Sequence, residues 1–170
     1  MCEYCGCQAI TAVAELTREH DAVLGHVRTA GQAARSGDDA AASAACLVLL
    51  DLLGPHTAVE EQALFPAMAR EHPEHVGVLR AEHASVDRVL REVASAGPAV
   101  HGWQARLVRA LDVLSAHVFK EQDGLFPAAV STLSADDWDA VDADCTPIDI
   151  FLGIQGRAPA CDDFIRRMAT

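Results

Sequence analysis

The sequence contains few aromatic residues and no runs of β-branched residues at a two-residue period. Only 5% of its 170 residues are aromatic, and alanine, leucine and valine dominate instead. This composition favours helices over strands. At 51% hydrophobic content, a chain of this length can bury the core of a single domain. The sequence therefore predicts one domain that is nearly all α.

Positive charge and long apolar stretches are also scarce. The formal net charge of −12, with only 13 Lys and Arg, would repel phosphate backbones and anionic membrane surfaces, so we expect no nucleic-acid partner. The longest apolar run, from Ala44 to Leu50, is far shorter than the roughly 20 residues of a membrane helix. Residues 1–4 show neither a positive start nor an apolar stretch. We therefore expect no secretory signal, no membrane partner and a cytoplasmic location.

Four long segments carry apolar residues at steps of three and four, which indicates helices. Short stretches rich in glycine, proline, aspartate or serine separate these segments. We expect helices at about residues 10–34, 40–70, 73–96 and 102–130. Because short connections make neighbouring helices antiparallel, the pattern predicts an up-down-up-down four-helix bundle over residues 10–131.

Two further segments flank the predicted bundle. Residues 1–9 are a cysteine-rich amino-terminal segment, and residues 132–170 are a carboxyl-terminal appendage. Ser134 is followed three residues later by Asp137, which resembles a helix N-cap, so we expect a short helix at about residues 135–143. Beyond this helix the periodicity disappears, and we expect an irregular strap.

The chain also contains an internal repeat. Residues 56–67 and 117–128 both read His-x3-Glu-x3-Leu-Phe-Pro-Ala. The preceding helices match as well, because His20 and His83 each follow a glutamate. The repeating unit is therefore a helical hairpin. Two such hairpins related by a pseudo-two-fold axis would place equivalent side chains around one point, which predicts a symmetric pair of metals.

Histidine and glutamate occupy core positions of all four predicted helices. Residues four apart lie on one face of a helix, so His56 with Glu60, and likewise the pair in the second repeat, presents an imidazole beside a carboxylate. A buried ionised carboxylate costs several kcal/mol unless a cation compensates it. A lone core histidine would more often be a plain core residue, but four at repeat-related positions favour a metal site. The candidate metal ligands are His20, His56, Glu60, His83, His117 and Glu121.

Other acidic and histidine side chains receive smaller roles. Glu19 and Glu82 point about 100° away from the histidines that follow them, so we expect both to face solvent. Glu61 is either an acceptor behind the ligands or solvated, because its counterpart in the other repeat is Gln122. The remaining histidines lie off the apolar seam or in loops, and we assign no site role to His26, His72, His75 and His101.

This set of motifs resembles the hemerythrin-like, or HHE cation-binding, family. The family pattern of His, His-x3-Glu, His and His-x3-Glu is met by the six candidate ligands over about residues 10–130, and Glu-Glu-x-x-Leu-Phe-Pro after the first pair is similar to family members. The resemblance implies a non-haem centre of two iron ions with an oxo or hydroxo bridge. It also implies that His20 and His56 bind one iron, that His83 and His117 bind the other, and that both glutamates bridge.

One departure from the family pattern bears on function. Oxygen-carrying hemerythrins have a further histidine one turn before the ligand of the third helix, where this chain has Leu79. Each iron would then have about four protein ligands, which leaves roughly two of six positions for a bridge, water or an exogenous ligand. We therefore expect redox chemistry with peroxide, oxygen or nitric oxide in preference to reversible oxygen carriage.

The amino-terminal cysteines form a dense cluster. Without an export signal, thiols or metal ligands are favoured over disulfides. As thiolates, Cys2, Cys5 and Cys7 could bind zinc if Cys145 or Cys161 supplied a fourth ligand. The alternative is a set of exposed, redox-reactive thiols without a fixed partner.

The sequence leaves several functions open. The leading hypothesis is a di-iron protein that binds or reacts with small oxidants, namely hydrogen peroxide, oxygen or nitric oxide, with catalase-like or peroxidase-like turnover as one version. The alternative is an iron or redox sensor, or a module that delivers iron to damaged iron–sulfur proteins through the amino-terminal cysteines, by analogy with a subgroup of the family. A third hypothesis is a structural bundle that holds zinc.

Overall fold

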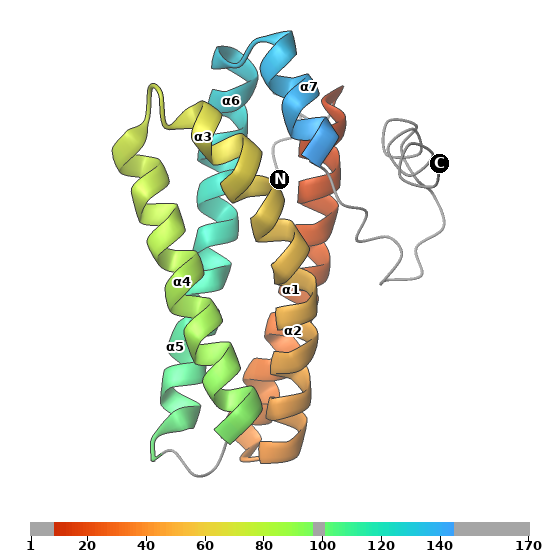
Figure 1. Ribbon diagram of the computed structural model, residues 1–170. Coiled ribbons are helices and arrows are strands. Elements are labelled where there is room, and N and C mark those ends of the chain that lie inside the picture. Colours follow the sequence, from red (N-terminus) through yellow and green to blue (C-terminus); the bar gives the residue numbers. More distant parts are fainter. Residues whose placement is uncertain (1–8, 97–100, 145–170) are drawn as a thin grey trace.

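The computed structural model describes residues 9–96 and 101–144 of the chain (Figure 1). All secondary structure in these two ranges is helical, which confirms the predicted all-α class. The elements are α1 (Thr11–Ser36), α2 (Asp39–Val59), the π-helical turn η2 (Glu60–Leu64), α3 (Phe65–Met68), α4 (Pro73–Ala96), α5 (Trp103–Lys120), the π-helical turn η4 (Glu121–Leu125), α6 (Phe126–Thr132) and α7 (Ala135–Asp144).

Four long helical rods surround a common interior. Two of them are α1 and α4, and the other two are the composite rods α2–η2–α3 and α5–η4–α6. Figure 1 shows successive rods running in opposite directions. Helix α1 packs against α2, α2 against α4, α4 against α5, and α5 returns to α1. Helix α7 packs against α1 and η2 at the end of the bundle where α3 and α6 lie.

The turn between α1 and α2 lies where the glycine and aspartates of the sequence predicted it. Gly37 has a left-handed backbone with φ 72°, and its N–H donates to the carbonyls of Ala33 and Ala34. Only glycine adopts this conformation without a Cβ penalty, which is why it ends the helix. The side chain of Asp38 then accepts from the Ala41 N–H at 2.9 Å and begins α2.

A polar layer divides the apolar core into two clusters. Along α1, Leu16 belongs to one cluster and Val23 to the other. Along α4, Leu79 and Val86 divide in the same way. His20 and His83 lie between these pairs in the sequence, at the level where neither cluster continues. The fold therefore places a polar layer between two apolar ones.

The rod Asp39–Met68 is long and apolar enough to meet the length and composition of a membrane span. Core helices of bundles meet the same test, and this rod packs against α1 and α4. It also carries Glu60, which is fully buried. We therefore interpret the rod as a bundle helix.

The two π-helical turns are features that the sequence analysis missed. In each, the N–H of a phenylalanine, Phe65 or Phe126, donates to the carbonyl five residues earlier, which belongs to a candidate glutamate ligand. A proline follows each phenylalanine and has no N–H to give. Within the first of these turns, the Arg80 guanidinium donates to the carbonyl of Glu61 at 3.0 Å. The repeated Leu-Phe-Pro motif could have indicated these turns, because its proline lacks an N–H.

Ser134 and Asp137 cap α7 reciprocally. The Ser134 N–H donates to Asp137 Oδ2 at 3.0 Å, and the Asp137 N–H donates to Ser134 Oγ at 3.3 Å. Hydrogen bonds from Ser134, aided by one from Arg70, hold the pKa of Asp137 at about 2. The cap therefore keeps an ionised carboxylate at the start of the helix at neutral pH.

Substitution Ser134→Ala should loosen α7, because it removes the acceptor of one helix N–H and one donor to Asp137. Loss of such a cap costs about 1 kcal/mol, so amide hydrogens of α7 should exchange several times faster. Ser131→Ala is the matched control, since the Ser131 hydroxyl bonds only within α6, to the Pro127 carbonyl. Equal exchange rates in the two variants would contradict the capping role.

Candidate metal centre

The polar layer brings together all six candidate ligands predicted from the sequence. Their side chains are only 0–8% exposed. They come from every rod of the bundle: His20 from α1, His56 and Glu60 from the α2–η2 junction, His83 from α4, and His117 and Glu121 from the α5–η4 junction.

The six residues form two groups of four that share both glutamates. One group consists of His20, His56, Glu60 and Glu121, and the other of Glu60, His83, His117 and Glu121. Within each group the potential ligand atoms all lie within 4.8 Å of one another. Imidazole nitrogens and carboxylate oxygens at such separations have the chemistry and spacing to hold one cation per group.

Each glutamate faces one histidine of each group. The two oxygens of Glu60 lie 3.3 Å from His56 Nε2 and 3.3 Å from His83 Nε2. The oxygens of Glu121 lie 3.0 Å from His117 Nε2 and 3.1 Å from His20 Nε2. A carboxylate placed in this way can offer one oxygen to each of two cations.

The buried carboxylates lack hydrogen bonds that would compensate them. Among the described residues, none of the carboxylate oxygens of Glu60 and Glu121 has a hydrogen-bond partner of acceptable geometry. The two ring nitrogens of His20 also lack such a partner within the described residues. Groups of this kind are rarely left unpartnered in a core, and an ionised carboxylate there costs several kcal/mol. The donor set therefore fits bound cations.

Protonation of the histidine rings leads to the same conclusion. The Nδ1 atoms of His83 and His117 lie 2.9 Å from Glu61 Oε1 and 3.0 Å from Glu82 Oε2. An ionised carboxylate only accepts, so each Nδ1 carries the hydrogen and each neutral ring keeps a lone pair on Nε2. The two Nε2 atoms are 2.9 Å apart. Two lone pairs at this distance require a proton or a metal ion between or beside them.

Glu19 and Glu82 do not face solvent, so that prediction was wrong. Their side chains are only 13% and 19% exposed, and Glu19 Oε2 lies 2.8 Å from His56 Nδ1. Each glutamate points away from the histidine next to it in sequence, but that direction leads to a histidine on the neighbouring rod. The recurrence of a glutamate directly before a histidine in both repeats could have indicated this pairing. Such carboxylate–histidine pairs orient metal-binding rings and make them stronger donors.

The carboxylate partners are not symmetric between the two repeats. Glu61 accepts from His83, and Gln122 occupies the corresponding position in the second repeat. Within the described part of the chain, Nδ1 of His20 has no hydrogen-bond partner. The His83 and His117 pair therefore has two carboxylates behind it, whereas the His20 and His56 pair has one.

Phenylalanines of the two Leu-Phe-Pro motifs lie against histidine rings. Phe65 stacks on His83 with ring centroids 5.5 Å apart, and Phe126 stacks on His20 at 5.7 Å. Both contacts join the equivalent residues of the repeat. They fix the planes of two rings whose Nε2 atoms face the glutamates.

Electrostatics of the side chains favour positive charge at this site. Burial alone would lower the pKa of His56, but the carboxylates of Glu60 and Glu19 raise it well above its usual value. Burial would also lower the pKa of His117, but the carboxylate of Glu121 raises it above its usual value. Burial would raise the pKa of Glu60, yet His56 and His83 lower it well below its usual range. Protons and metal ions therefore compete for the same lone pairs.

The remaining predicted residues are not part of this site. Cys2, Cys5, Cys7, Cys145 and Cys161 lie outside the described residues, so the second metal or redox site stays a prediction. The other histidines belong to neither metal-binding group found among the described residues: His26, His72, His75 and His101.

Comparison with known proteins gives one match. No curated protein and no solved structure matches the chain. The family model of the hemerythrin HHE cation binding domain matches residues 11–129, which include α1 to α5 and all six converging side chains. The chain therefore belongs to the hemerythrin HHE cation-binding domain family.

Proposed function

We propose that this protein is a non-haem di-iron protein whose centre binds or reacts with small oxidants, namely hydrogen peroxide, oxygen or nitric oxide. The observation that carries the proposal is the pair of four-residue groups that share two buried glutamates. Two cations bridged by carboxylates are the simplest occupants of such an arrangement. Mixed imidazole and carboxylate ligands suit iron among the common metals.

In this proposal His20 and His56 hold one iron, His83 and His117 hold the other, and Glu60 and Glu121 bridge them. Four protein ligands leave about two of six positions for an oxo or hydroxo bridge and an exogenous ligand. Leu79, where oxygen carriers have a further histidine, is fully buried in the apolar cluster between the site and α7. When bound, each iron can supply one electron, and reduction of one peroxide requires two electrons.

The chain itself orients the candidate ligands and buries the two glutamates among them. The apolar clusters on both sides of the polar layer leave Glu60 and Glu121 without exposed surface. Glu19, Glu61 and Glu82 hold Nδ1 of three histidines, so that Nε2 of each is free to bind a cation. The proposal includes a pseudo-two-fold relation between the two helical hairpins. It is supported by the matching glutamate, histidine and phenylalanine contacts of the two halves.

The alternative functions remain separate hypotheses. Iron delivery or redox sensing depends on the amino-terminal cysteines, which the structure does not describe. A structural zinc site would use the same six ligands, but it predicts a colourless protein. Metal content and the visible spectrum therefore distinguish iron from zinc, and a peroxide assay decides whether the protein is an enzyme.

The iron-loaded protein should contain about two irons per chain, in line with two four-residue groups. It should show charge-transfer absorption that changes on addition of hydrogen peroxide, and it should consume peroxide. His83→Ala should lower iron content and peroxide consumption, whereas His75→Ala, at an exposed position of α4, should change neither. Metal analysis and absorbance spectroscopy give the readout. Equal peroxide consumption in the two variants would exclude an enzymatic role of this centre.

Glu82→Gln should weaken metal binding by about 10- to 100-fold, the usual effect of removing a carboxylate behind a histidine ligand. The amide can no longer accept from His117 as an anion, and the charge pairing with Lys120 is lost. Glu74→Gln, in the exposed first turn of α4, is the matched control. Competitive titration of ferrous ion against a chelator measures both variants. An unchanged affinity of Glu82→Gln would mean that this carboxylate does not support the ligand.

A further inference from the structure

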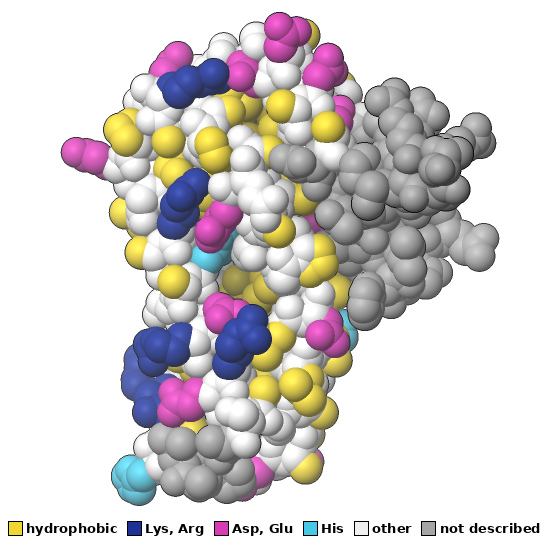
Figure 2. All heavy atoms as spheres, viewed as in Figure 1, with side chains coloured by type: hydrophobic (Ala, Val, Ile, Leu, Met, Phe, Trp, Pro, Cys, Tyr) yellow, Lys and Arg dark blue, Asp and Glu magenta, His cyan; other side chains and the backbone are white. Residues whose placement is uncertain are grey.

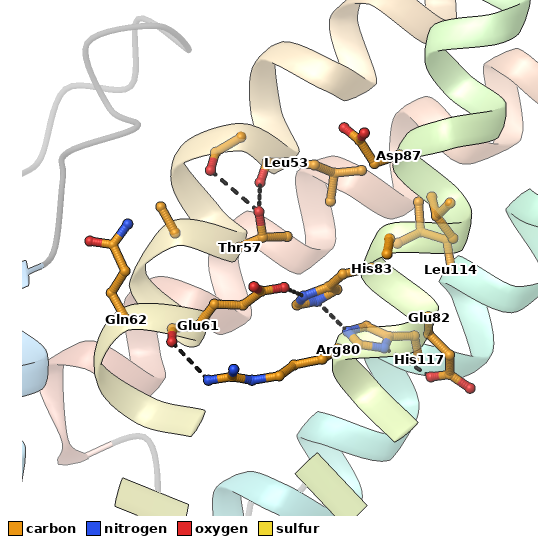
Figure 3. A pocket seen from close by; sticks show the side chains of 14 residues that line it. Leu53, Thr57, Glu61, Gln62, Arg80, Glu82, His83, Asp87, Leu114 and His117 are labelled. Carbon is orange, nitrogen blue, oxygen red and sulfur yellow. Dashed lines mark hydrogen bonds and ion pairs between the residues drawn. The ribbon is translucent and has the colours of Figure 1, made fainter. Parts of the chain in front are cut away.

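A pocket of about 500 Å³ lies beside the metal centre, between α2 and α4 (Figure 3). Its walls include Leu53, Val86 and Leu114, and His83 and His117 lie side by side in it. The other four candidate ligands do not line it. The pocket therefore approaches only one of the two four-residue groups.

Burial of the ligands agrees with this one-sided access. His83 is 8% exposed, which is the largest value among the six. Figure 2 shows histidine at the surface near the middle of the bundle, next to acidic side chains and a hollow that contains apolar ones. A molecule in the pocket would meet the His83 and His117 pair first.

The size of the pocket exceeds what the small oxidants need. A water molecule takes about 30 Å³ of liquid volume, and oxygen, nitric oxide and hydrogen peroxide are of similar scale. Pockets of roughly 300–1,000 Å³ are typical of sites for organic molecules. The lining is mixed: Leu53, Val86 and Leu114 are aliphatic, Gly54 and Ala84 are small, and more than half of the lining residues are polar or charged. Space and surface therefore fit a ligand with an apolar body.

The charges that line the pocket limit the ligand further. Glu61, Glu82 and Asp87 outnumber the single basic residue, Arg80. The Arg80 guanidinium is bound to the Glu61 carbonyl, and Asp87 is paired with Arg91. Glu61 is likewise paired with His83 and Glu82 with Lys120, so each lining carboxylate already has a partner and the pocket offers little net charge to hold a charged ligand. A neutral molecule with one polar end is the best match.

We propose that this pocket binds a neutral organic hydroperoxide as a substrate of the centre, with its apolar body on Leu53, Val86 and Leu114 and its peroxide end toward His83 and His117. The inference rests on the proposed di-iron function and names its substrate class. The O–O bond breaks, one oxygen stays on the organic alcohol, and the other leaves as water. Two protons come from solvent, and the two electrons come from the ferrous centre, which becomes ferric.

Gly54 offers a way to fill the pocket without disturbing the ligands. A Cβ built at Gly54 meets no atom within 4 Å, so the first carbon of a larger side chain has room at the pocket wall, and Gly54→Leu places the rest of that side chain there. Leucine also stabilises a helix relative to glycine. Gly77→Leu on α4 is the matched control, because Gly77 is equally open and does not line the pocket. Ala84→Leu fills the pocket from the opposite wall.

The reduced, iron-loaded protein is mixed with cumene hydroperoxide or hydrogen peroxide, and the formation of 2-phenyl-2-propanol and of ferric absorbance is timed. Gly54→Leu and Ala84→Leu should slow the reaction with cumene hydroperoxide by about tenfold or more, the effect of losing the burial of roughly two methylene groups. Both should leave the reaction with hydrogen peroxide within about twofold. Gly77→Leu should change neither rate. Equal slowing of both peroxides, or no slowing, would overturn the proposal.

Binding without turnover gives an independent readout. In the zinc-loaded protein, 2-phenyl-2-propanol should shift the methyl NMR signals of Leu53 and Leu114, and Gly54→Leu should abolish the shifts. Absence of these shifts in the wild-type protein would overturn the pocket assignment. If neither peroxide reacts but the alcohol binds as expected, the di-iron function has failed while the organic ligand site stands.

Discussion

Two glutamates without any exposed surface lie in the middle of this bundle, and the ionised form of each needs positive charge close by. Four histidines surround them, and their rings are held so that Nε2 faces the carboxylates. The apolar clusters on both sides raise the cost of an uncompensated carboxylate, because they keep water from solvating its charge. The polar layer is therefore costly without a cation and favourable with one, which ties the fold of the core to metal binding.

The orientation of the histidines depends on partners from other helices. Glu19 on α1 holds His56, and Glu82 on α4 holds His117, so each carboxylate crosses to the neighbouring rod. Gln122 occupies the position in the second repeat that corresponds to Glu61. His20 has no hydrogen-bond partner at Nδ1 among the described residues. The two halves of the centre therefore differ in charge and hydrogen bonding, although they share one ligand pattern. The pocket lies on the half with more carboxylates.

The two π-helical turns follow from the local sequence and carry the two candidate glutamate ligands. In each composite rod the candidate glutamate ligand begins the turn, and the Phe-Pro pair follows its last residue. Proline lacks the N–H that a regular α-helix would use, and the wider turn moves the backbone hydrogen bond one residue back. The carbonyl of Glu61, within the first turn, accepts a hydrogen bond from Arg80, and both residues line the pocket. The repeated motif thus shapes the site through backbone as well as side chains.

The sequence by itself determined the helical class, the ends of the long helices and the six side chains that converge. Apolar spacing, glycine and proline determine helices and their ends through neighbouring residues of the chain. The repeated His-x3-Glu spacing places both side chains on one face of each helix. Only the tertiary structure decided which carboxylate meets which histidine, that α-helix gives way to π-helix at both glutamates, and that a pocket opens beside His83. These features depend on neighbouring rods: Glu19 and Glu82 look solvent-facing on their own helices and become buried only when the next helix packs against them.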